Sequence, residues 1–154
     1  MFEKEINSRK LTHMNSVGVF MRENAYKYGL NADEMYVVGL LHDVGYLRGR
    51  HRHSSYGANL ISDVFDTSLD SSALQAIRLH DTLCDKWEDG AKDNPVLFLL
   101  IKADLSVDTN GCFVGRKARL KDIAKRYGKS SHEYEVAVSL IDYTFNNEER
   151  FLKT

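Results

Sequence analysis

The chain has 154 residues, of which 43% are hydrophobic and 28% are charged. This balance excludes a disordered or fibrous protein and predicts one folded domain over residues 1–154. The 21 Lys and Arg side chains nearly cancel the 22 Asp and Glu side chains, and the formal net charge is -1. No global field therefore attracts nucleic acid or an anionic membrane, and we expect no nucleic-acid partner.

Hydropathy and cysteine usage indicate a cytoplasmic protein. The longest apolar run, residues 96–101, is far shorter than the roughly 20 residues that span a bilayer, so we expect no membrane partner. Residues 1–10 are rich in charge and lack the apolar core of a secretory signal. Cys84 and Cys112 follow no metal-binding or redox spacing, and we expect both to be reduced.

Apolar residues recur at spacings of three and four, which predicts an all-α fold, a bundle of about six to seven helices. The first helix is expected over about 7–28, with Gly29 as its stop. Its predicted inner stripe consists of Leu11, Met14, Val17, Met21 and Ala25. Asn31 has the character of an N-cap for the second helix, which is expected to end near Gly45.

Five further helices are predicted over about 53–65, 71–80, 95–107, 116–127 and 131–151. Asn94 followed by Pro95 is a strong start signal, and Ser130 with Glu133 reads as a capping box. Residues 81–94 form the longest expected loop. No repeat or linker divides the chain.

Five ionisable side chains lie on helix stripes that are otherwise apolar: His13, His42, His53, His80 and Asp104. A buried carboxylate costs several kcal/mol unless it is paired or binds a metal. No Lys or Arg is an obvious partner of Asp104 in the sequence. One His in such a position is more often structural, but five similarly placed polar residues favour a bound cation.

Asp43 follows His42 directly, and neighbours on a helix point about 100° apart. Both can reach one site only at a corner, which we expect Gly45 to supply by ending or kinking the helix. Small Gly57 would let the following helix approach closely. Imidazole and carboxylate ligands without thiolates suit one or two divalent Fe, Mn, Ni, Co or Zn ions rather than Ca. His51 and His132 are expected on the surface.

These residues resemble the HD-domain superfamily of metal-dependent phosphohydrolases, an all-α fold named for its adjacent His-Asp pair. The resemblance covers about residues 9–107. It rests on His13 in Leu-Thr-His-Met-Asn-Ser-Val, His42-Asp43 in Gly-Leu-Leu-His-Asp-Val-Gly and Asp104 in Ile-Lys-Ala-Asp-Leu. His53 and His80 match members that hold a second metal. The chain is most similar to small single-domain members such as the bacterial symmetrical diadenosine tetraphosphate hydrolases.

The resemblance implies that one ion is held by His13, His42, Asp43 and Asp104, and that Asp43 bridges to a second ion held by His53 and His80. It also implies hydrolysis of a phosphate ester or anhydride, in a nucleotide or related small molecule, by metal-activated hydroxide. Asp43 is thus a predicted catalytic residue.

The sequence departs from its relatives at two positions. No Gly-Tyr-Pro signature follows His80, which disfavours a cyclic dinucleotide substrate, and Tyr46 stands where many relatives have a phosphate-contacting Lys. We expect this role to fall to Arg48, Arg50 and Arg52, in the loop after the His-Asp pair.

Two other functions use the same ligands. One is an HD-fold di-iron oxygenase, and the other is a non-catalytic nucleotide-binding regulatory domain. We interpret the basic stretch from Arg116 to Lys129 as solvated surface in preference to a binding site for a polyanion. We expect Trp87 to pack against other side chains rather than to stack on a nucleobase. Aromatic residues of the last helix could close the core or form a homodimer face: Tyr134, Tyr143 and Phe145.

Overall fold

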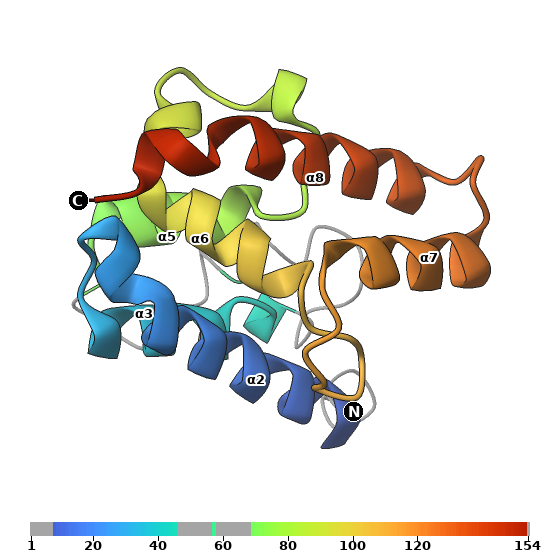
Figure 1. Cartoon of the computed structure of the whole chain (residues 1–154), viewed down its shortest axis with the longest axis horizontal. Coiled ribbons are helices and arrows are strands. Elements are labelled where there is room, and N and C mark those ends of the chain that lie inside the picture. Colours follow the sequence, from blue (N-terminus) through green and yellow to red (C-terminus); the bar gives the residue numbers. More distant parts are fainter. Residues whose placement is uncertain (1–7, 46–56, 58–68, 154) are drawn as a thin grey trace.

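The computed structural model describes residues 8–45, 57 and 69–153, and every regular element in these ranges is a helix (Figure 1). The predicted all-α class is confirmed. The α-helices are α2 (Ser8–Asn24), α3 (Ala32–Leu41), α5 (Ser71–Leu79), α6 (Pro95–Asp104), α7 (Arg116–Tyr127) and α8 (His132–Phe151). The 3-10 helices are η1 (Ala25–Tyr28), η3 (Cys84–Lys86) and η4 (Ala91–Asp93). In the same ranges, no helix is long and apolar enough to cross a membrane.

Helix α6 is the centre of the bundle. Its residues 96–101 are all at most 4% exposed, as expected for a helix that is apolar on every side. Figure 1 shows α6 between α8 on one side and α2 on the other, with α7 running beside α8. Helices α2, α3, α5 and α8 all contact α6. Helix α6 is therefore packed against four other helices of the bundle.

The inner face of α2 differs from the predicted stripe at one position. Met14, Val17, Met21 and Ala25 are buried, but Leu11 is 55% exposed. The line that runs through residues 21, 17 and 14 continues to residue 10, because these positions are three or four apart. Leu11 lies at the edge of this face, so its assignment to the core was wrong.

Helices α2 and α3 touch through their backbones. A Cβ atom added to Gly39 would lie 2.5 Å from Cα of Gly18, much closer than any ordinary contact. The α3 cap is as predicted, since the side chain of Asn31 accepts a hydrogen bond from the backbone N–H of Glu34. The close crossing fixes the end of α3 against the middle of α2.

Several helix ends differ from the predictions. Helix α3 ends at Leu41 rather than near Gly45, so His42 and Asp43 lie in the turn that follows it. Helix α6 ends at Asp104 instead of residue 107. The cap of α8 is Ser131, whose hydroxyl accepts from the N–H of Tyr134, and not Ser130. In the first two cases the polar residues at the helix end contact other elements of the bundle.

The expected loop over residues 81–94 contains η3 and η4. Within it, Trp87 donates from Nε1 to the carbonyl of Thr82 and packs edge-on against Tyr143 at 4.9 Å between ring centroids. Tyr143 is buried and closes the core, whereas Phe145 is 53% exposed with the Arg116 guanidinium over its ring. These contacts support packing roles for Trp87 and Tyr143.

The helix predicted over 53–65 lies outside the described residues except for Gly57, which is helical and buried. A Cβ on Gly57 would meet the backbone N of Gly45 at 3.2 Å. The predicted close approach at Gly57 is therefore present, and it takes place directly beside the corner that follows His42 and Asp43. Cys84 and Cys112 are both free, as expected.

Candidate metal centre

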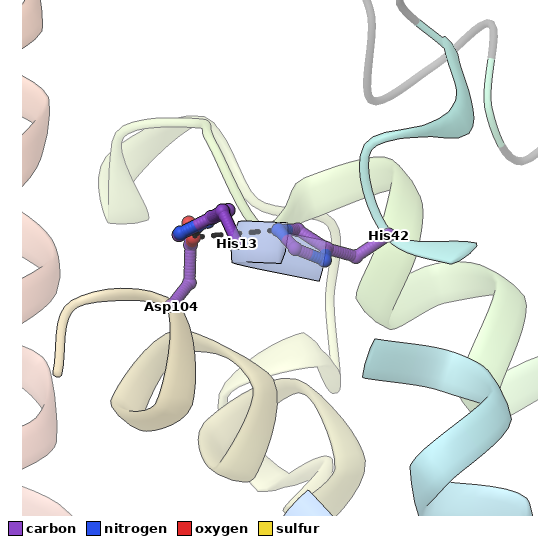
Figure 2. A group of neighbouring side chains, drawn as sticks. All are labelled: His13, His42 and Asp104. Atoms are coloured by element: carbon purple, nitrogen blue, oxygen red, sulfur yellow. Dashed lines mark hydrogen bonds and ion pairs between the residues drawn. The ribbon is translucent and has the colours of Figure 1, made fainter. Parts of the chain in front are cut away.

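Five of the predicted ligands come together where the carboxyl ends of three helices meet the side of α2. His13 lies in α2, His42 and Asp43 follow α3, His80 follows α5, and Asp104 is the last residue of α6. Four of these residues are buried, and Asp104 keeps 22% of its side chain exposed. Figure 2 shows His13, His42 and Asp104 pointing toward one another from three different elements.

The cluster consists of two overlapping groups that share His42. In the first, Oδ1 of Asp104 lies 2.8 Å from Nε2 of His13 and 3.3 Å from Nε2 of His42 (Figure 2). In the second, Asp43 places Oδ2 3.2 Å from Nε2 of His42 and Oδ1 3.4 Å from Nε2 of His80. The two oxygens of Asp43 thus face two different imidazoles.

All three imidazoles are held in the same way. Nδ1 of His13 lies 2.9 Å from the carbonyl of Asp108, Nδ1 of His42 lies 2.6 Å from the carbonyl of Gly39, and Nδ1 of His80 lies 2.6 Å from the carbonyl of Ile77. A carbonyl oxygen only accepts hydrogen bonds, so each Nδ1 is the protonated nitrogen. In the neutral ring, Nε2 then presents a lone pair to the cluster.

This arrangement is unfavourable without a positive charge at its centre. Neutral imidazoles and carboxylates would set one lone pair against another at each of the four short contacts. Nε2 of His42 is fully buried and has no hydrogen-bond partner of acceptable geometry among the described residues. Either protons on the imidazoles or a metal cation must therefore lie between the histidines and the carboxylates.

The pKa values of the side chains in the cluster agree with protonated imidazoles. Burial lowers the pKa of His42, but the negative charges of Asp43 and Asp104 outweigh it and raise the pKa to about 10. Burial likewise raises the pKa of Asp104, but His42 and the hydrogen bond from His13 hold it well below its usual range. The two carboxylates therefore stabilise a positive charge beside them, on a protonated imidazole or on a metal ion.

The geometry fits the second possibility. Bonds of about 2.1 Å from nitrogen or oxygen to a transition metal place neighbouring ligand atoms about 3.0–3.4 Å apart. The four contacts of 2.8–3.4 Å lie close to this range. Histidines that bind metals also usually donate their other N–H to a carbonyl or carboxylate, which fixes the ring. His13, His42, Asp43, His80 and Asp104 can therefore hold a divalent ion in either group.

Lys10 was not predicted as part of this cluster. Its Nζ lies 3.3 Å from Oδ2 of Asp43, and 26% of its side chain is exposed. The signal for Lys10 was present in the sequence, because the residue stands three and four positions before His13 and Met14 on the inner line of α2. The predicted stripe began at Leu11 and therefore missed Lys10.

Some predicted site residues lie outside the described part of the chain: the ligand His53, the phosphate-binding residues Arg48, Arg50 and Arg52, and also Tyr46 and His51. Exposed His132 is at the surface, as predicted. Most of the basic stretch forms α7, in which Arg119 and Arg126 both donate to Asp122. These internal pairs agree with a surface helix.

The HD domain family model matches residues 11–147 of the chain, a range that includes all six predicted metal ligands. The resemblance to this superfamily is confirmed. No curated protein and no solved structure matches the chain. The more specific resemblance to diadenosine tetraphosphate hydrolases therefore stays a prediction.

Proposed function

Because this chain belongs to the HD domain family, we propose that it is a metal-dependent phosphohydrolase that cleaves a phosphate ester or anhydride of a nucleotide or related small molecule. HD domains bind divalent metals and are mostly metal-dependent hydrolases. The observation that supports the proposal most directly is the common tautomer of His13, His42 and His80, whose Nε2 lone pairs converge on two carboxylates.

The chain's own residues have separable roles in this proposal. The backbone carbonyls of Asp108, Gly39 and Ile77 fix the three rings, so that little reorganisation is needed when an ion binds. Asp43 is oriented so that its two oxygens face two different imidazoles, His42 and His80, which would suit a bridging carboxylate. When bound, divalent ions supply an activated water and neutralise the charge that develops on the phosphoryl oxygens.

Residues from the sequence analysis complete the proposed site. His53 is proposed as a further ligand of the ion at Asp43 and His80. Arg48, Arg50 and Arg52 are proposed to bind phosphate oxygens, because guanidinium groups bind them in pairs of hydrogen bonds. The removal of two of these charges in Arg50→Ala with Arg52→Ala should raise KM for a nucleotide substrate.

The decisive test begins with metal content. Protein purified without chelator should contain about one to two transition-metal ions per chain by elemental analysis, and His42→Ala should lose them. His132→Ala is the matched control, because it removes an exposed imidazole and should keep the wild-type metal content. Absence of metal in the wild type, even after loading with Mn or Fe and desalting, would refute the proposed site.

Phosphate release is then measured over a panel of nucleoside phosphates, dinucleoside polyphosphates and simple phosphoesters. We expect hydrolysis by the wild type and none by Asp43→Ala, with the helix content by circular dichroism nearly unchanged. A metal-loaded protein that cleaves nothing on the panel would favour a binding domain. Oxygen-dependent turnover of a phosphonate or polyol with near two Fe per chain would instead favour an oxygenase.

A further inference from the structure

Lys10 is the basic side chain that the structure brings to the cluster from α2. It lies one helical turn before His13, so both side chains leave the same face of α2. Its Nζ is 3.3 Å from Oδ2 of Asp43, the oxygen that also lies 3.2 Å from Nε2 of His42. The ammonium group thus sits at the edge of the second ligand group.

Lys10 is also on the side of the cluster that reaches solvent. The three histidine side chains are at most 5% exposed and that of Asp43 is 7% exposed, whereas those of Lys10 and Asp104 are 26% and 22% exposed. Among the described residues of the cluster, an anion that approaches from solvent therefore meets one carboxylate and one ammonium group. Of these two, only Lys10 attracts it.

Occupation of the ligand group by a divalent ion changes what Lys10 can bind. A divalent ion held by Asp43 would neutralise the charge of that carboxylate and repel the ammonium group, so the contact between Lys10 and Asp43 would weaken. The flexible four-carbon stem of lysine lets Nζ move several ångström without any backbone shift. A nearby phosphoryl oxygen is then the strongest acceptor for it, since lysine binds phosphate well as a point charge.

We propose that Lys10 binds a non-bridging phosphoryl oxygen of the substrate, and that it exchanges Asp43 for this oxygen once the metal is bound. This inference rests on the proposed function. It defines the substrate more narrowly, as one whose scissile phosphate carries a free anionic oxygen on the α2 side of the cluster.

The test measures inorganic phosphate binding to the Mn-loaded full chain by titration calorimetry. The removal of a charged hydrogen bond in Lys10→Gln should weaken phosphate binding about 10-fold or more. Lys10→Arg keeps the charge and should recover most of the affinity. Arg9→Ala is the matched control, because it removes a positive charge from an exposed neighbour on the same helix. It should leave phosphate binding unchanged.

Metal content separates a substrate-binding role from a structural one. Lys10→Gln and a second variant, Lys10→Met, should keep the wild-type metal content and melting temperature. Loss of metal in these variants, or unchanged phosphate affinity, would overturn the inference, as would a Mn-loaded wild type that binds no phosphate. Phosphate release by the wild type on the substrate panel decides the proposed function separately, so the two failures are distinguishable.

Discussion

Replacement of Gly39 by Ala tests whether the close crossing of α2 and α3 positions the metal ligands. The new Cβ would lie 2.5 Å from Cα and 2.6 Å from the backbone N of Gly18, where ordinary contacts begin at 3.4 Å. Because both contacts are with backbone, no side chain can move aside. The helices must therefore separate by nearly 1 Å.

The energetic cost follows from two opposing effects. Overpacking costs about 3 kcal/mol at the upper end of its usual range, which is appropriate where the backbone itself must shift. Alanine regains about 1 kcal/mol over glycine in helix propensity. The net destabilisation of about 2 kcal/mol corresponds to a fall of about 4–8 °C in Tm for a chain of this length.

The same shift should weaken the metal site. The Gly39 carbonyl accepts the Nδ1 hydrogen bond of His42 at 2.6 Å, so displacement of Gly39 carries the ring with it. A change in such a supporting contact typically costs about 10–100-fold in metal affinity. We expect a loss of this size in a competitive chelator titration with Mn.

The control is Val37→Ala, which introduces alanine at an exposed position of the same helix. Its Tm should stay close to that of the wild type, because exposed substitutions usually change stability by less than about 0.5 kcal/mol. If Gly39→Ala melted within about 2 °C of the wild type and bound Mn equally well, the proposed coupling between the helix crossing and the cluster would be wrong.

Two further predictions concern pH and helix capping. Asp70→Ala should cost about 1 kcal/mol in thermal melts, because Asp70 caps α5 by accepting from the N–H of Ala73, while Asp70→Asn should cost far less. The Ser72 hydroxyl and the Ala73 N–H lower the pKa of Asp70. The contribution of the Asp70 carboxylate to stability is therefore present above the ordinary value of 3.8 and is lost as pH falls through the lowered value. The Asp70→Asn variant should not show this loss of stability. In chelator-treated protein, the facing carboxylates overcome the effect of burial and raise the pKa of His42 to about 10. The stabilisation by protonated His42 is then complete below pH 6.5 and disappears as pH rises through about 10, and equal melting temperatures at pH 6 and pH 10 would contradict this.

The local signals in the sequence predicted most of the fold. Asn31 and Asn94 each accept hydrogen bonds from backbone N–H groups of the helix that follows, which depends only on residues within a few positions. The burial of residues 96–101 likewise follows from an unbroken apolar run. The burial of His13, His42 and His80 follows from the same pattern, since a helix carries the residues of its apolar stripe into the interior.

Tertiary structure decided what these polar residues contact. His13 meets Asp104 across 91 residues of sequence, and Lys10 meets Asp43 across 33, distances over which no helical period carries information. Helix α3 ends at Leu41, and His42 and Asp43 in the turn that follows contact Asp104 and His80 of other elements, which propensity alone cannot predict.

The sequence by itself therefore determined the helical class, the caps of α3 and α6 and the burial of the histidines on apolar stripes, because each depends on nearest neighbours or on the helical period. Only the tertiary structure decided the tautomer of His13 and the partner of Lys10. The carbonyls that orient His42 and His80 are local, but the one that orients His13 comes from Asp108, and the helices must dock before these atoms meet. The charge balance of the centre is thus a property of the packed bundle.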